Sequence, residues 1–250
     1  MTARPLLLAA VLLSLWSGGA GAQTPGAESA RKGLTADEAA TQDGDWIGYR
    51  DAYMQMIRFE KYGKPKQLLL HHFQVSPAEK GTPMEGVRLI LSGSSMQLNL
   101  PLDAAGRAVF PLLKSAYDEN ARLMLNRRGN HYLMQPRVSI APRANGSYDS
   151  ADLRAACEQA LNYLRYIGKP GMQDKSCAGV RFSFPAAAGD PVVRFRSAEQ
   201  AAAPLSSETG SAFQDDRTTF RIVDFHFSDW PQKGQVVTQG SPVAIAPLFR

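Results

Sequence analysis

The sequence predicts an α+β fold: an antiparallel β-sandwich with a docking helix before it and a disulfide-pinned helix plus further strands after it. Three observations support this prediction. Apolar residues recur at every second position between residues 66 and 142, they recur at helical spacing on either side of that stretch, and the chain has two cysteines. We expect residues 45–143 to form the first helix and the sandwich. Residues 149–250 then form either a second domain or the completion of the first.

The first 22 residues are predicted to be a signal peptide. Arg4 supplies a short positive segment, residues 6–16 form an apolar run, and residues 20–22 have the small-x-small pattern that a signal peptidase cuts. Residues 23–44 carry few large apolar side chains, which predicts a flexible leader. No other stretch approaches the ~20 apolar residues of a membrane-spanning helix. We therefore expect a periplasmic or secreted protein with no transmembrane span.

A docking helix is predicted over residues 46–62. Asp45 can cap it, Gly63 can end it, and large apolar side chains recur between them at helical spacing: Trp46, Tyr49, Tyr53 and Ile57. This stripe favours packing of the helix against a sheet. A ligand-facing surface is the alternative.

Six short strands are predicted in the stretch of period two, at residues 67–75, 86–91, 96–102, 108–113, 121–126 and 131–140. So many short strands in one stretch are typical of an antiparallel β-sandwich. The clearest piece runs from Leu100 to Leu112, as a strand, a turn from Asp103 to Gly106 and a returning strand. This piece resembles the Asp-x-x-Gly hairpin of transthyretin-like and immunoglobulin-like sandwich modules of secreted proteins. The resemblance implies a fold and no activity.

The second half begins with a predicted helix over residues 150–168, which Ser150 can cap. Cys157 lies on its apolar stripe, and in an oxidising compartment it is expected to form a disulfide with Cys177, which stabilises the fold by about 3 kcal/mol. A redox or metal-binding pair is the less favoured alternative, because the spacing is not C-x-x-C. Strands are predicted at residues 179–184, 192–196, 218–227, 235–237 and 243–249, the last two as a hairpin, with an exposed loop over residues 198–211.

One candidate catalytic pair, Asp224 and His226, shares a face of a predicted strand. A carboxylate beside an imidazole can orient a general base or, with Asp229, hold a metal ion. Alternation alone predicts that these side chains face water while their neighbours face the core, and we favour this interpretation. His71 and His72 are adjacent on a strand and point to opposite faces, so we predict no metal site there. No phosphate-binding glycine motif occurs, so no cofactor is expected.

A second candidate site is a basic patch. Five arginines fall within one stretch and can gather at one end of the sandwich: Arg122, Arg127, Arg128, Arg137 and Arg143. Such a patch can hold phosphate or carboxylate groups of a lipid, a polysaccharide or an acidic protein. Arginines on strands also protect sheet edges from pairing, which is the alternative. The net charge of +5 is spread along the chain, and no nucleic-acid partner is expected.

Signal, size and expected disulfide together resemble uncharacterised exported (periplasmic) proteins of Gram-negative bacteria. We expect a non-catalytic binding or structural protein of the cell envelope, whose partner is an anionic envelope component or another exported protein. Two alternatives stay open. One is a hydrolase or metal-dependent enzyme that uses the face of Asp224 and His226, and the other is an inhibitor or chaperone-like accessory of another exported protein.

Overall fold

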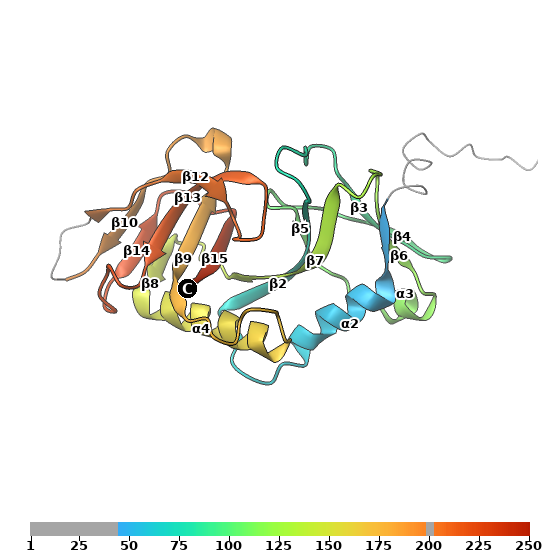
Figure 1. Cartoon of the computed structure of the whole chain (residues 1–250), viewed down its shortest axis with the longest axis horizontal. Helices are drawn as coiled ribbons and strands as arrows, with labels where there is room; N and C mark the ends of the chain where they lie inside the picture. Colours follow the sequence, from blue (N-terminus) through green and yellow to red (C-terminus); the bar gives the residue numbers. More distant parts are fainter. Residues whose placement is uncertain (1–44, 199–202) are drawn as a thin grey trace, which may run out of the picture. The chain divides into compact units, whose positions relative to one another are not determined.

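The structure is a computed structural model that describes residues 45–198 and 203–250 (Figure 1). The predicted signal peptide and leader lie outside this part of the chain. Antiparallel β-sheets and a few helices make up the described residues, which confirms the α+β class. No helix within these ranges is long and apolar enough to cross a membrane.

The described strands form four sheets. The first has the spatial order β1-β6-β3-β4, with β1 at Trp46–Gly48, β6 at Arg122–Leu125, β3 at Leu89–Ser92 and β4 at Gln97–Leu100. The second has the order β5-β2-β7, with β5 at Arg107–Ala108, β2 at Leu69–Pro77 and β7 at Tyr132–Ile140. These two sheets hold the six strands that the sequence predicts in this region, three in each.

The other two sheets come from the second half of the chain. One has the order β11-β10-β14-β8, with β11 at Ala203–Pro204, β10 at Val193–Arg196, β14 at Gln235–Thr238 and β8 at Ser147–Asp149. The other has the order β12-β13-β9-β15, with β12 at Glu208–Ser211, β13 at Thr219–His226, β9 at Cys177–Phe184 and β15 at Ala244–Phe249. The described helices are α2 at Tyr49–Glu60, α3 at Lys114–Asp118, α4 at Ser150–Tyr166 and the 3-10 helix η1 at Ala186–Ala188.

The docking helix starts later than predicted. Trp46–Gly48 is a strand paired with β6, so α2 begins at Tyr49 after Gly48, which makes no side-chain cap. Asp45 is not the cap, because its carboxylate accepts hydrogen bonds from the backbone N–H groups of Gly129 and Asn130 at 3.1 and 2.8 Å. Pairing with a distant strand outweighs the local helical pattern here.

The predicted hairpin around Asp103 is wrong, although its turn is present. The Gly106 N–H donates to the Asp103 carbonyl at 2.9 Å, as a turn requires. The strands on its two sides, however, pair with different partners: β4 with β3, and β5 with β2. The Gly106 carbonyl accepts from Val75 N at 2.8 Å, so the turn carries the chain from the first sheet to β2 of the second. The predicted strand 108–113 shortens accordingly, and α3 follows it.

Three further predictions for the second half are corrected. Ser150 is the first residue of α4 rather than its cap, and its hydroxyl donates to the Pro231 carbonyl at 3.0 Å. Residues 203–211, expected as an exposed loop, include β11 and β12, because β10 and β13 offer them free edges; residues 199–202 lie outside the described part. The predicted C-terminal hairpin is wrong, since β14 pairs with β10 and β8 while β15 pairs with β9.

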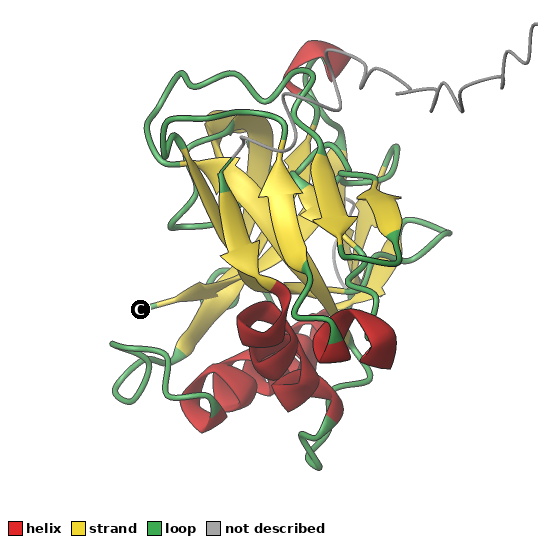
Figure 2. Ribbon diagram, turned by 90° about the vertical axis from the view of Figure 1, so that its right-hand side faces the viewer, coloured by secondary structure: helices red, strands yellow, loops and turns green. Residues whose placement is uncertain are grey.

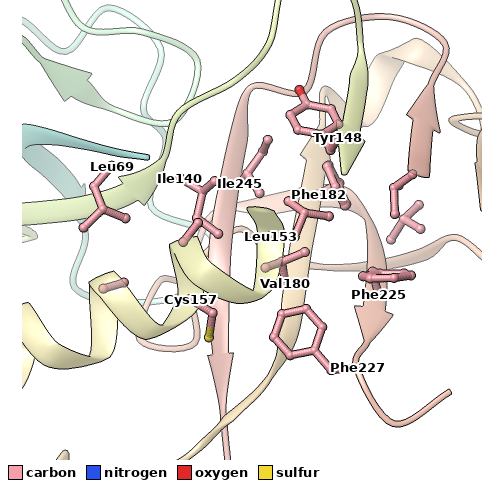
Figure 3. Close-up of a cluster of buried hydrophobic side chains, with 14 of the residues drawn as sticks. Leu69, Ile140, Tyr148, Leu153, Cys157, Val180, Phe182, Phe225, Phe227 and Ile245 are labelled. Atoms are coloured by element: carbon pink, nitrogen blue, oxygen red, sulfur yellow. The ribbon is translucent and has the colours of Figure 1, made fainter. Parts of the chain in front are cut away.

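Helices α2 and α4 lie on the same side of the strands (Figure 2). Helix α2 docks on the sheets as predicted, but its buried stripe shares only Tyr49 with the predicted one: Tyr49, Ala52 and Met56 pack into a core with β2, β3 and β6, and Phe59 packs into a second core with α4. Of the other predicted stripe residues, Trp46 is 52% exposed on β1, and Tyr53 and Ile57 are partly buried. In that second core, Leu153 of α4 lies over Val180 and Phe182 of β9 (Figure 3). Burial of these side chains supplies most of the stability of the fold.

The predicted disulfide is confirmed. Cys157 of α4 is bonded to Cys177 at the start of β9, and their Cα atoms are 6.0 Å apart. The bond therefore joins the helix to the sheet that it covers, on the face where Cys157 is fully buried.

Candidate ligand-binding cleft

The candidate catalytic pair lies on β13 and faces a hollow of about 400 Å³ that Asp229 and Trp230 also line. Both oxygens of Asp224 accept hydrogen bonds from Arg181, the residue opposite it on β9, each at 2.8 Å. His226 is exposed at the strand end. Asp224 is therefore held by a guanidinium rather than by the imidazole.

The alternation predicted for this strand is confirmed, because Val223, Phe225 and Phe227 are buried. Within residues 45–198 and 203–250, no group of three or more histidine, cysteine, aspartate or glutamate side chains is placed to hold a metal ion. The enzyme hypothesis remains a prediction.

The arginines of the predicted patch lie on separate elements. Arg122, on β6, places its guanidinium 4.4 Å from the ring centre of Trp46. Arg127 donates to the Glu85 carbonyl at 3.5 Å, and Arg128 follows it in the loop before β7. Arg122 is the first residue of β6, whereas Arg127 and Arg128 follow its last residue, so the strand separates Arg122 from the other two.

The other two arginines have carboxylate partners within the chain. Arg143 lies before β8 and forms ion pairs with Asp149, at 3.2 Å, and with Asp152. Arg137 lies on β7 of the second sheet and pairs with Asp215 at 2.6 Å. Carboxylates within the chain therefore balance the charges of Arg143 and Arg137, and Arg137 belongs to a different feature of the molecule.

That feature is a cavity of about 260 Å³, which we call the β7–β15 cleft. It lies between β7, the end of α4 with the loop that follows, the loop before β13, and β15. Its walls are mostly apolar, and the main contributors are Val138, Leu164, Ile167, Met172, Phe213 and Phe249. Its charged groups are Arg137, Lys169 and Asp215.

Sheet topology explains why a cavity forms here. β7 is the last strand of its sheet and β15 is the last strand of another, so within the described residues each has one side without a strand partner. Pro247 lies in β15 and lines the cleft. Proline is tolerated on such an edge because it has no N–H group to offer a further strand. The two edges are close but do not form a ladder, which leaves the space that side chains line.

The charged end of the cleft is built on Arg137, whose side chain is only 11% exposed. Its Nη1 donates to Asp215 Oδ1 at 2.6 Å, its Nε donates to Gln74 Oε1 at 2.6 Å, and its guanidinium lies 4.5 Å from the ring centre of Phe213. Its Nη2 is buried and has no hydrogen-bond partner among the described residues. A buried N–H group without a partner is uncommon and costs stability.

Asp215 is the counter-charge of this end. Burial raises the pKa of its carboxyl, but the charge and hydrogen bond of Arg137 and the charge of Lys169 outweigh burial, so the pKa lies below its ordinary value. Lys169 Nζ is 3.8 Å from Asp215 Oδ2. Asp215 is therefore ionised at neutral pH, while its side chain remains 44% exposed.

A buried polar network of Gln74 and Asp216 holds the side chain of Arg137 in place. Gln74 is fully buried on β2, and its Nε2 donates to Asp216 Oδ2 at 3.1 Å and to the Ala105 carbonyl at 2.9 Å. Asp216 is also buried, and its Oδ1 accepts from the backbone N–H groups of Arg217 and Thr218 at 2.7 and 3.1 Å. Gln74 thus holds the guanidinium in one orientation, as a rigid binding group requires.

Of the charged residues of this cleft, the sequence singles out only Arg137, as a member of the predicted basic patch. The sequence does not indicate that Lys169, Asp215 and Gln74 lie near Arg137. The one available signal is Gln74, a polar residue inside a predicted buried strand, which must find partners when it is buried. Nothing in the sequence shows that these partners are Arg137 and Asp216, because 63 and 142 positions separate them from Gln74.

The cleft offers apolar walls, two positive groups and one negative group at one end. This combination suits binding of a small molecule with an apolar body. No family model, curated protein or solved structure matches this chain. The function is therefore inferred from the residues of the cleft.

Proposed function

We propose that the protein is a non-catalytic binding protein that takes a small, mostly apolar molecule in the β7–β15 cleft. The arrangement of its lining supports this proposal: apolar side chains form the walls, and the charged groups converge at one end. Small-molecule sites have this composition, with volumes of roughly 300–1,000 Å³ for drug-sized ligands. A cavity of about 260 Å³ suits a smaller molecule or one segment of a larger one.

Export is part of the proposal. The disulfide between Cys157 and Cys177 supports an oxidising compartment, where such bonds persist. For an exported protein, the expected role in the cell envelope is then binding of an apolar or amphipathic compound outside the cytoplasm.

We further propose that the two sheets of the first half pack face to face as a β-sandwich. The core residues Phe73, Leu91 and Leu123, which come from both sheets, support this arrangement.

Binding of a neutral fluorescent probe tests the proposal. We expect N-phenyl-naphthylamine to bind at one saturable site and Met172→Trp, which adds bulk to the cleft from a loop, to weaken it about tenfold or more, a loss of about 1.4 kcal/mol. Met54→Trp is the matched control, because Met54 is 52% exposed on α2 and does not line the cleft. Equal probe affinity in the two variants would place the ligand elsewhere.

A further inference from the structure

We propose that the ligand of the β7–β15 cleft is an amphipathic carboxylate, a single carboxylate on an alkyl tail, and that Asp215 occupies the place of that carboxylate in the ligand-free protein. This inference rests on the proposed function, because it names the ligand class of the same cleft. It follows from the charge at one end of the cleft, from the geometry of Arg137 and from the exposure of Asp215.

The distribution of charge favours an anionic head group. Arg137 and Lys169 supply two positive charges at one end, and Asp215 supplies the only acidic side chain that lines the described cleft. A wholly apolar ligand would contact the apolar walls of the cleft and would make no use of these charged groups. Moreover, when a ligand carboxylate replaces the carboxylate of Asp215, the charge beside Arg137 is conserved, so the exchange leaves no buried charge without a partner.

The geometry of Arg137 favours a carboxylate among anions. A guanidinium presents parallel N–H groups that match the two oxygens of a carboxylate. The Arg181–Asp224 pair uses both carboxylate oxygens in this way, each at 2.8 Å. Asp215, in contrast, accepts from Arg137 through Oδ1 alone, and Nη2 has no partner within residues 45–198 and 203–250. A ligand carboxylate that reaches both Nη1 and Nη2 would satisfy the group that Asp215 leaves unsatisfied.

The carboxylate of Asp215 can move away from Arg137 when a ligand carboxylate binds. Asp215 lies in the loop between β12 and β13, and 44% of its side chain is exposed, so its carboxylate can turn into water without breaking the core. Arg137 cannot follow it, because Gln74 holds its Nε and the ring of Phe213 lies against its guanidinium. The cation therefore stays in place while its anionic partner is exchanged.

Three ligands with the same tail test the inference: decanoate, decanol and decylamine, each measured by displacement of the neutral probe near neutral pH. We expect decanoate to bind about tenfold tighter than decanol, and decylamine to bind weakest. Asp215→Asn removes the competing charge, so it should tighten binding of decanoate severalfold more than binding of decanol. Lys169→Ala should weaken binding of decanoate severalfold more than binding of decanol.

The matched control is Asp118→Asn, which removes an exposed aspartate paired with Lys114 on α3, away from the cleft lining. It should leave all affinities unchanged, and thermal unfolding checks that each variant is folded. Equal affinities of decanoate and decanol, or an Asp215→Asn variant that tightens both equally or neither, would overturn the inference. The proposed function survives these results if the neutral probe still binds and Met172→Trp weakens it. If the probe itself does not bind, both fail.

Discussion

His71 lies between aromatic rings rather than at a surface. Its imidazole stacks on Phe59 with ring centres 4.6 Å apart and meets the edge of Tyr163 at 5.7 Å. Its Nε2 is buried, and no described residue forms a hydrogen bond with it. Burial lowers the pKa of His71 from 6.5 to about 4, and the positive groups of His72 and Lys66 contribute. At neutral pH this histidine is uncharged and acts as a packing group.

This environment predicts a pH-dependent loss of stability. The unfolded chain, in which His71 has its ordinary pKa of 6.5, binds a proton before the folded chain does. The contribution of His71 is therefore fully present above about pH 6.5 and falls by about 3 kcal/mol as the pH drops to about 4. His71→Phe should remove most of this loss from the free energy of unfolding, measured with urea across that range. His226→Gln changes an exposed histidine, and its free energy of unfolding should depend on pH as in the wild type. If the free energy of unfolding of His71→Phe falls with pH as steeply as that of the wild type, His71 does not cause the loss.

At the scale of elements, the turn from Asp103 to Gly106 joins two sheets. The carboxylate of Asp103 accepts from the backbone N–H groups of Ala105 and Arg107, each at 2.9 Å, and pairs with the Arg107 guanidinium at 2.8 Å. Arg107 in turn donates to Ser139 Oγ on β7 at 3.0 Å. The motif that resembles a hairpin turn thus serves as a crossing between sheets.

Gly106 is required for this crossing. Its φ is +70°, and a Cβ atom at this position would lie 2.1 Å from the Val75 carbonyl oxygen. Gly106→Ala should lower the free energy of unfolding by about 2 kcal/mol or more in urea titrations, through backbone strain and the clash with β2. Gly63→Ala is the matched control, because an added Cβ would meet no atom of the described part of the chain within 4 Å. We expect this substitution to change the free energy of unfolding by less than about 0.5 kcal/mol. Equal effects of the two substitutions would mean that the turn tolerates a side chain.

At the scale of the whole described molecule, α4 and β9 are held together both by a core and by a covalent bond. The core places Leu153, Ala156 and Ala160 of α4 against the sheet, and the disulfide closes the 20-residue separation between the two cysteines. The same helix ends at the β7–β15 cleft, where Leu164 and Ile167 form part of the wall. The position of this wall therefore depends on how firmly α4 is docked.

Removal of the disulfide tests that dependence. The double variant Cys157→Ala with Cys177→Ala should lose about 3 kcal/mol of unfolding free energy. Wild-type protein under dithiothreitol should show a similar loss, which separates loss of the bond from loss of the sulfur atoms. We also expect weaker probe binding by the variant. A loss below about 1 kcal/mol would mean that core packing alone fixes α4.

The sequence alone predicts those parts of the fold that depend on local periodicity and covalent chemistry. These are the α+β class, the helix from residue 150, the alternation along β13 and the disulfide. Only the tertiary structure decides which strands pair. Trp46–Gly48 forms a strand in the first sheet, β4 and β5 belong to different sheets, and so do β14 and β15. Strand pairing depends on partners that are distant in the sequence, and a local pattern does not encode them. For the same reason the sequence cannot reveal the cleft: Arg137, Lys169 and Asp215 are far apart in the chain and meet only where two sheet edges come together.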